Sequence, residues 1–159
     1  VDIERLKGQH FPFGTYFHEF EINDTEYLTD VLKNKIKFNI KPDRINITEV
    51  NFPGAHPHTD AWTVALNYYF ETGSDETVFY TPKENANPRR HRHDKVNVYD
   101  LSDLERIDAF RAEAGECFLF DTSIVHSVAV AKKGAVRKIM RATWLSGTVE
   151  EIFNSLELL

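Results

Sequence analysis

Three residues with metal-binding side chains form the most informative pattern in this chain. His58 and Asp60 stand two positions apart, and His126 follows sixty-eight residues after His58. Residues two apart in a strand point to the same side, so the His-x-Asp pair could reach one ion. Two imidazoles and one carboxylate can occupy one face of an octahedral Fe(II) and leave three positions open. The pattern predicts a metal site, with His56 as an alternative ligand.

Two arginines follow the second histidine on a segment that reads as a strand. Arg137 lies eleven residues after His126, and Arg141 lies four residues further on. An arginine can bind a carboxylate through two parallel hydrogen bonds. Residues four apart in a strand share a face, so both side chains would point the same way and Lys138 the other way. The alternative is that these arginines only pair with surface acids.

The order His-x-Asp, His, Arg resembles the Fe(II)/2-oxoglutarate oxygenase superfamily. Residues 110–128 carry a glycine turn, an apolar strand, an acid, a short loop and His126, in the order that this superfamily shows. The resemblance implies that His58, Asp60 and His126 hold Fe(II). A histidine after this apolar strand could instead be a buried structural residue.

Residues 135–144 most resemble the taurine dioxygenase branch of that superfamily. In this branch the first arginine holds the far carboxylate of 2-oxoglutarate, which implies this role for Arg137. The second arginine contacts substrate, which implies a substrate-binding role for Arg141. Arg141 could instead hold the cosubstrate, together with the threonine two positions after it.

Two further residues are assigned to 2-oxoglutarate by resemblance. The turn at residues 73–79 is similar to one in the taurine dioxygenase branch, where a threonine in the place of Thr77 binds the cosubstrate. Here Ser74 and Glu76 replace a tighter glycine turn. Tyr69 resembles a prolyl-hydroxylase tyrosine that donates its hydroxyl to 2-oxoglutarate. The alternative for Tyr69 is an ordinary interstrand aromatic residue.

The resemblance covers about residues 44–147 and implies a dioxygenase that uses Fe(II) and the cosubstrate 2-oxoglutarate. Such an enzyme releases succinate and carbon dioxide and hydroxylates a substrate, here unidentified. Two alternatives stay open. One is a cupin-type metalloenzyme that does not use 2-oxoglutarate, and the other is a non-catalytic jelly-roll binding protein.

The elements needed to position these residues are mostly strands. Apolar and alternating segments separated by glycine turns predict a mainly β fold, a double-stranded β-helix or jelly roll of the cupin kind with one or two flanking helices. The predicted strands of the core cover residues 45–52, 62–71, 76–81, 96–99, 109–113, 117–121, 127–131 and 137–145.

We expect a single domain, 1–159, because 159 residues suit one hydrophobic core. Its parts would be an N-terminal strand and covering helix at 1–43, the core at 44–147 and a C-terminal helix at 148–159. The N-terminal strand falls within residues 11–22, and the helix begins at Asn23 or Asp24 and reaches about Lys35. Its stripe at residues 27–32 would cover the apolar face of the 62–71 strand.

One long polar segment, residues 83–95, interrupts the pattern of strands. It contains Arg92 among several basic residues and reads as a loop. Long loops in compact domains often bind ligands, so Arg92 is a candidate substrate contact. The equally good alternative is a solvated hairpin connection. The substrate could be a small anionic molecule near Arg141, or an acidic peptide or phosphate backbone at this loop.

Composition excludes some classes of protein. A net charge of −6 argues against a chain-wide nucleic-acid or anionic-membrane surface, although a local basic patch could still act. Cys117 is the only cysteine, which excludes a disulfide scaffold. No apolar run has transmembrane length, and the first residues lack the pattern of a signal peptide. We expect a soluble, cytoplasmic protein without a membrane partner; the oligomeric state is not predicted.

Overall fold

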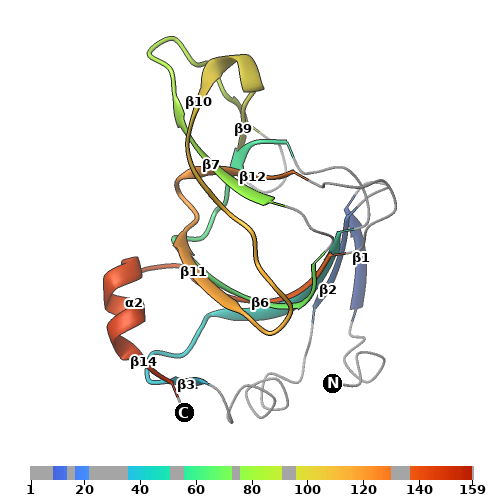
Figure 1. Ribbon diagram of the computed structural model, residues 1–159, viewed down its shortest axis with the longest axis vertical. Coiled ribbons are helices and arrows are strands. Elements are labelled where there is room, and N and C mark those ends of the chain that lie inside the picture. Colours follow the sequence, from blue (N-terminus) through green and yellow to red (C-terminus); the bar gives the residue numbers. More distant parts are fainter. Residues whose placement is uncertain are drawn as a thin grey trace.

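The computed structural model describes residues 9–13, 17–21, 36–50, 56–72, 76–90, 96–129 and 137–158. In this part of the chain, two six-stranded antiparallel sheets face each other, and a small two-stranded sheet lies outside one of them (Figure 1). Two facing antiparallel sheets of this kind form a jelly roll, so the predicted mainly β fold class is confirmed.

We name each large sheet after one of its strands. In spatial order, the β6 sheet consists of β1 (Gln9–Phe13), β2 (Phe17–Glu21), β4 (Arg44–Val50), β13 (Arg137–Trp144), β6 (Val64–Glu71) and β11 (Cys117–Asp121). In spatial order, the β7 sheet consists of β10 (Leu104–Phe110), β7 (Glu76–Pro82), β12 (Val125–Ala129), β5 (His58–Thr59), β9 (Asn97–Val98) and β8 (Arg89–Arg90). The small sheet pairs β14 (Leu156–Leu158) with β3 (Ile36–Phe38).

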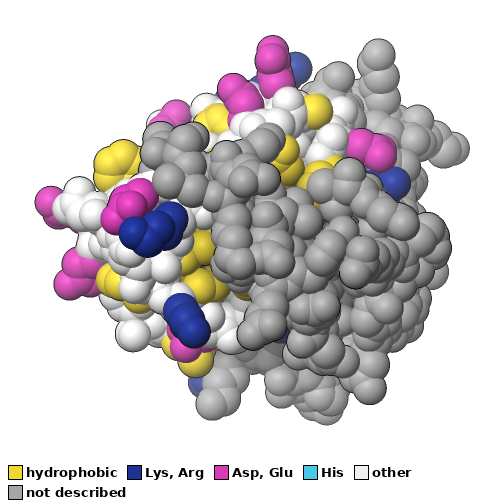
Figure 2. Space-filling view, turned by 90° about the horizontal axis from the view of Figure 1, so that it is seen from below, with side chains coloured by type: hydrophobic (Ala, Val, Ile, Leu, Met, Phe, Trp, Pro, Cys, Tyr) yellow, Lys and Arg dark blue, Asp and Glu magenta, His cyan; other side chains and the backbone are white. Residues whose placement is uncertain are grey.

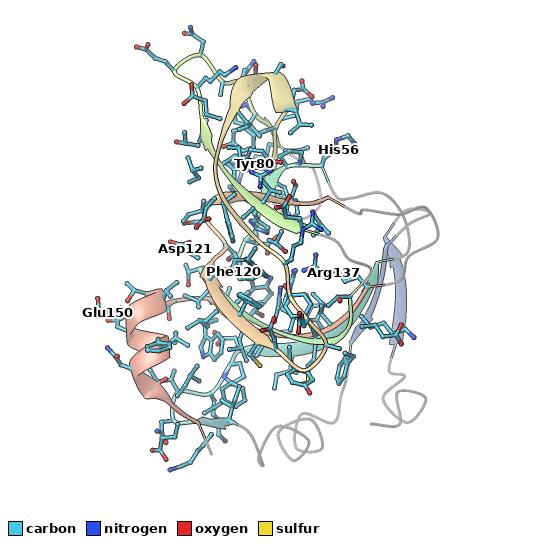
Figure 3. The ribbon with its side chains drawn as sticks, in the orientation of Figure 1. His56, Tyr80, Phe120, Asp121, Arg137 and Glu150 are labelled. Atoms are coloured by element: carbon cyan, nitrogen blue, oxygen red, sulfur yellow. The ribbon has the colours of Figure 1, made fainter. Side chains whose placement is uncertain are left out.

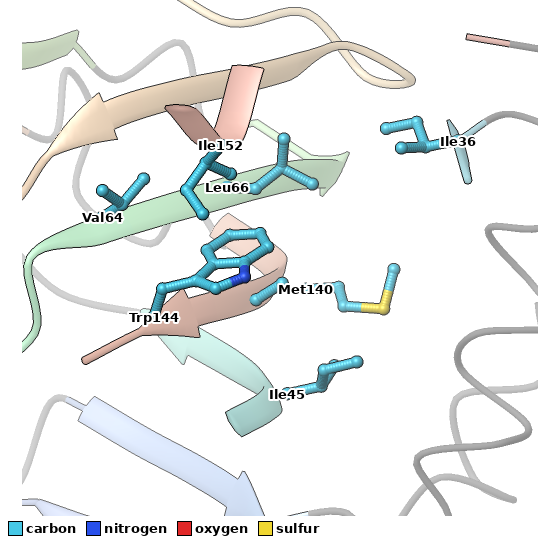
Figure 4. Packing of buried hydrophobic residues seen from close by; sticks show 8 residues of the cluster. Ile36, Ile45, Val64, Leu66, Met140, Trp144 and Ile152 are labelled. Carbon is cyan, nitrogen blue, oxygen red and sulfur yellow. The ribbon is translucent and has the colours of Figure 1, made fainter. Parts of the chain in front are cut away.

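Alternation along β6 separates two environments. Val64 and Leu66 point away from the β7 sheet and pack in an apolar cluster with Trp144 of β13 (Figure 4). Asn67 and Tyr69 occupy the opposite face, which the β7 sheet covers. β13 lies between β4 and β6 and alternates in the same register, so its odd-numbered residues share the inner face with Asn67 and Tyr69.

The outer cluster is covered by α2 (Val149–Ser155) and by β3. Ile152 of α2 and Ile36 of β3 are both buried in the cluster. Burying one isoleucine side chain contributes roughly 1.5–3 kcal/mol. The prediction that residues 27–32 cover this face concerns a segment outside the described residues. Among the described residues, α2 and β3 provide the cover.

The C-terminal helix begins where predicted but is shorter. Thr148 is the N-cap, and its hydroxyl and the Glu151 carboxylate form a capping box. The helix ends at Ser155, because Leu156 is extended and starts β14, and Asn39 donates its backbone N–H to the Ser155 carbonyl. Phe153, predicted to lie on the buried stripe, is 64% exposed.

Several strand boundaries differ from the prediction. β10 runs from 104 to 110, whereas a strand was predicted at 109–113. This strand is at an edge of its sheet and most of its side chains are exposed, so its mixed charged sequence shows no clear alternation. The predicted strand within 11–22 is a hairpin of β1 and β2. Part of the predicted 83–95 loop forms β8, which pairs with β9, and the 3₁₀ helix η2 (Leu101–Asp103) follows.

The described surface mixes both charge signs. Seen from below, Figure 2 shows basic and acidic side chains close together among apolar ones. The exposed Lys37–Glu157 ion pair, 3.0 Å long, joins β3 to β14, and such exposed pairs stabilise a fold only weakly. The described part of the chain contains no helix that is long and apolar enough to span a membrane.

Candidate metal centre

The β5–β12 pairing brings the two predicted histidine ligands together. His58 and His126 are direct cross-strand partners, with ring centroids 4.6 Å apart. Asp60 follows β5 directly, and its carboxylate lies 3.3 Å from Nε2 of His58 and 3.8 Å from Nε2 of His126. One ligand atom from each residue lies within 4.8 Å of the other two. His56 is exposed and does not belong to this cluster.

Backbone carbonyls orient both imidazole rings. Nδ1 of His58 lies 2.8 Å from the His56 carbonyl, and Nδ1 of His126 lies 2.8 Å from the Ile124 carbonyl. A carbonyl only accepts, so each Nδ1 carries the proton and each Nε2 can present its lone pair to an ion when the ring is neutral. Metal-binding histidines in proteins are commonly held in this way through their second nitrogen.

Burial and nearby charge set the protonation of the cluster. Burial lowers the pKa of His126 to about 4, so its ring is neutral near pH 7. Burial alone would raise the pKa of Asp60, but the hydrogen bond to His58 and the positive charge of Arg141 hold it well below its usual range. Burial also opposes protonation of His58, yet Asp60 outweighs this effect and raises the pKa of His58. The cluster therefore contains an ionised carboxylate beside a neutral imidazole.

Two polar atoms of the cluster lack hydrogen-bond partners in the described structure. They are Oδ2 of Asp60 and Nε2 of His126, and both are buried. A buried acceptor without a partner costs free energy, and a cation bound between the three side chains would satisfy both atoms. Two imidazoles, one carboxylate and the remaining open positions suit a divalent transition metal such as Fe(II).

A second polar group surrounds Arg137. Its Nη2 donates to the Tyr69 hydroxyl at 2.8 Å and to Oγ1 of Thr77 at 3.2 Å, and its guanidinium carbon lies 4.9 Å from the centre of the Tyr69 ring. All three side chains are buried. Figure 3 shows Arg137 between the two large sheets. The three residues predicted to bind 2-oxoglutarate thus lie together, on β13, β6 and β7.

Arg141 lies beside the metal-ligand cluster. Its Nε donates to Oδ1 of Asn67 at 3.2 Å, and its Nη1 lies 3.6 Å from Oδ2 of Asp60. Arg137 and Arg141 are four residues apart on one face of β13, which corresponds to about 13 Å along the strand. A ligand between the cluster and Arg137 would therefore pass close to Arg141.

Aromatic rings line the space between His126 and Tyr69. Phe110 and Phe118 stack at 3.9 Å, and both rings contact Tyr69 edge-on. Phe79 and Phe120 continue this layer to the His126 ring. We call these four phenylalanines the aromatic layer. These apolar rings make the surroundings of Arg137 and of the metal-ligand cluster less polar than water, and electrostatic interactions are stronger in such surroundings.

Sequence reasoning missed Thr122, the residue that connects the segment of Asp60 to the turn before β12, the strand of His126. Thr122 is fully buried in the turn between β11 and β12, and its carbonyl accepts a hydrogen bond from the backbone N–H of Asp60. Its hydroxyl donates to the Trp62 carbonyl, and its N–H donates to the Thr63 carbonyl. In sequence Thr122 is one polar residue of a turn, so no local signal distinguishes it. The predicted substrate contact Arg92 lies outside the described residues.

The fold and the cluster together define a cupin-type jelly roll with a possible metal site. Sequence comparison finds no matching family model and no matching curated protein. The fold is similar to that of SnoN, the non-heme alpha ketoglutarate dependent epimerase from nogalamycin biosynthesis, with a TM-score of 0.53 and 11% identity. This match covers 85% of this chain and 66% of SnoN.

Two other solved structures match at lower similarity. The 7S globulin of Momordica charantia matches with a TM-score of 0.49 and 10% identity, over 94% of this chain and 34% of the globulin. KdgF from Halomonas sp. matches with a TM-score of 0.43 and 8% identity, over 89% of this chain and 91% of KdgF. The chain thus spans about a third of the globulin and about two thirds of SnoN.

Proposed function

We propose that this protein is an Fe(II)- and 2-oxoglutarate-dependent dioxygenase that hydroxylates a substrate yet to be identified. The observation that carries the proposal is the convergence of His58, Asp60 and His126. Both histidines are oriented through Nδ1, and two buried ligand atoms, Oδ2 of Asp60 and Nε2 of His126, lack hydrogen-bond partners in the described structure. Such a set supplies three ligands on one side of an ion and leaves the other side open for cosubstrate and dioxygen.

The environment of Arg137 supports the choice of 2-oxoglutarate as cosubstrate. A buried guanidinium next to two hydroxyl groups, Tyr69 and Thr77, can hold a carboxylate through several hydrogen bonds at once. The aromatic layer lowers the local dielectric constant around this contact. In this proposal Arg137 holds the far carboxylate, Tyr69 and Thr77 add hydrogen bonds, and the keto acid end faces the metal-ligand cluster.

SnoN offers a parallel for the proposal. It is described as dependent on alpha ketoglutarate, and its structure was determined with Fe3+ and alpha ketoglutarate bound. At 11% identity the likeness shows a shared fold, so the activity is transferred to this chain only as a hypothesis. SnoN is an epimerase, whereas we propose hydroxylation as the default reaction here.

The chain's own residues would bind, orient and shield the reactants. Iron and 2-oxoglutarate, when bound, supply the oxidising chemistry in which dioxygen is consumed, succinate and carbon dioxide are released and the substrate gains a hydroxyl group. His58 and His126 keep fixed tautomers through the His56 and Ile124 carbonyls, so no reorientation is needed during turnover. The aromatic layer excludes water from the cosubstrate side.

The substrate side of the site is proposed to lie near Arg141. A small molecule carrying a negative charge would suit its guanidinium. The alternative substrate is an acidic peptide, which Arg92 of the 83–95 segment would also bind. The alternative function is a cupin-type metalloenzyme without 2-oxoglutarate. It is compatible with the same three ligands, because the metal-ligand cluster does not depend on Arg137.

The test has two stages, metal binding and then cosubstrate turnover. Anaerobic Fe(II) titration should show one site that His58→Ala abolishes, whereas His56→Ala, which changes an exposed neighbour, leaves it intact. With oxygen and 2-oxoglutarate, the protein should then form succinate even without its natural substrate, at a slow uncoupled rate. Arg137→Lys keeps the charge but loses the planar fork, so it should raise the KM for 2-oxoglutarate while Fe(II) binding stays unchanged.

The two stages separate the alternatives. Fe(II) binding without any succinate formation favours the cupin-type metalloenzyme. An absence of Fe(II) binding in the unmodified protein refutes both proposals and leaves a non-catalytic jelly roll.

A further inference from the structure

Asp60 lies between two positions for positive charge. On one side are Nε2 of His58 and of His126, where an ion would bind. On the other side is Nη1 of Arg141, 3.6 Å from Oδ2. Oδ2 lacks a hydrogen-bond partner in the described structure. The guanidinium therefore balances the charge of the carboxylate without forming a hydrogen bond to Oδ2. One carboxylate thus serves both a possible metal ion and an arginine.

Arg141 is held in this position. Its Nε donates to the amide oxygen of Asn67, which is itself 1% exposed. Asn67 and Arg141 are direct cross-strand partners in β6 and β13. The Arg141 side chain is only 20% exposed, and that of Asp60 only 11%, so water screens their interaction poorly. The guanidinium cannot leave the site without losing a hydrogen bond to a buried amide.

The charge balance of the site changes when a metal binds. In this group of side chains the unit charges of Asp60 and Arg141 cancel each other. A divalent ion on His58, Asp60 and His126 would give the group a net charge of about +2. The ion would engage the Asp60 carboxylate and would repel the nearby guanidinium. The metal-loaded site therefore has an excess positive charge, and an anion next to Arg141 would remove part of it.

We propose that Arg141 makes metal binding and anion binding mutually dependent. A bound metal ion would neutralise the Asp60 carboxylate, so the Arg141 guanidinium could pair with a small oxyanion or carboxylate instead. The bound anion would in turn reduce the repulsion between Arg141 and the metal ion. Because linked equilibria are reciprocal, each ligand tightens the other by the same factor. This inference rests on the metal site of the proposed function and on the anionic ligand that it places near Arg141, separate from the Arg137 contact. It adds that the binding of the metal and the binding of this anion are energetically coupled.

The experiment measures Fe(II) affinity anaerobically with sulfate as the anion probe. Titrations without 2-oxoglutarate are run in sodium sulfate and in sodium chloride at equal ionic strength. The variants are Arg141→Gln, which removes the charge but can still hydrogen-bond, and Arg141→Lys, which keeps the charge. Lys138→Gln is the matched control, because Lys138 lies on the same strand with a side chain that is 24% exposed, but it pairs with Glu71 on the other face.

For the unmodified protein we expect sulfate to tighten Fe(II) binding about tenfold, and Lys138→Gln to behave alike. Arg141→Gln should bind Fe(II) about tenfold more tightly in chloride, with no further gain from sulfate. Arg141→Lys should keep at least part of the sulfate effect. Circular dichroism of each variant checks that the fold is retained.

Two results would overturn the inference while leaving the proposed function standing. One is that His58→Ala abolishes Fe(II) binding, but the Fe(II) affinity of the unmodified protein is the same in sulfate and in chloride. The other is a sulfate effect of equal size in the unmodified protein and in Arg141→Gln, which would place the anion on the metal itself. An unmodified protein that binds no Fe(II) in either salt would overturn both the inference and the proposed function.

Discussion

Replacing Tyr69 with phenylalanine tests whether the buried Arg137 depends on the tyrosine hydroxyl. The substitution removes one oxygen and keeps the ring, so the stacked guanidinium and the edge-on contacts with Phe110 and Phe118 remain. What is lost is the 2.8 Å hydrogen bond from Nη2 of Arg137. The same nitrogen also donates to Thr77, but at the longer distance of 3.2 Å.

The expected size follows from the charge of the donor. A hydrogen bond to a charged group contributes about 1.5–3 kcal/mol, against about 0.5–1.5 kcal/mol for a neutral pair. Tyr80→Phe is the neutral comparison, because the Tyr80 hydroxyl lies 3.1 Å from the Ser127 hydroxyl in a partly buried site. The Tyr69 variant should therefore lose about 1.5–3 kcal/mol of unfolding free energy, and the Tyr80 variant about half as much or less.

Equilibrium urea unfolding of the metal-free protein measures both values. For a chain of this length, the loss in the Tyr69 variant corresponds to a melting temperature lower by about 3–12 °C. The slopes of the urea transitions should agree with that of the unmodified protein, which shows that the same surface is exposed on unfolding. An equal or larger loss in the Tyr80 variant would refute the reasoning, since the buried charge would then not depend on Tyr69.

Three further predictions concern the core, the turn and the metal. Ile152→Ala should lower the unfolding free energy by about 2–5 kcal/mol in urea titrations, because Ile152 is buried. Phe153 is adjacent but exposed, so Phe153→Ala should change the unfolding free energy by less than about 0.5 kcal/mol. Equal losses of stability in the two variants would contradict the packing of α2. Thr122→Val should weaken Fe(II) binding about tenfold, because the hydrogen bond from the Thr122 hydroxyl to the Trp62 carbonyl holds the segment that carries Asp60. Thr122→Ser keeps the hydroxyl and should bind Fe(II) as the unmodified protein does. An unchanged Fe(II) affinity in the valine variant would show that this hydrogen bond has no role in metal binding. Fe(II) at 100 times its Kd should raise the unfolding free energy by about 2.7 kcal/mol, and a chelator should reverse this change; a thermal shift that survives in His58→Ala would point to a different site.

The β6 strand shows why much of the fold could be predicted. Its apolar residues alternate with Asn67 and Tyr69, and this two-residue period alone separates the face of the outer cluster from the face of the site. The same period places Arg137 and Arg141 on one face of β13 and Lys138 on the other. Burial of one strand face therefore appears in the sequence as an alternation of apolar and polar residues.

The wrong strand and helix boundaries occur where burial produces no such alternation. β10 is an edge strand whose exposed charged residues hide its period. The last helix ends at Ser155 because Leu156 pairs with Phe38, a partner more than a hundred residues earlier in the chain. Local helical spacing could not reveal that pairing, because the hydrogen bonds of β14 depend on the position of β3.

Residue types and their alternation along the strands were enough to identify the side chains available for chemistry and the strand faces that carry them. Residue type and the alternation of a strand are local properties, so His58, Asp60, His126 and the two arginines could be named in advance. Three relations became visible only in the folded protein. They are which nitrogen of each ring faces the carboxylate, the role of His56 as a carbonyl acceptor and not a ligand, and the position of Arg141 beside Asp60. Those relations depend on contacts between β5, β12 and β13, and distances between segments far apart in the chain are set when the sheets pair and pack.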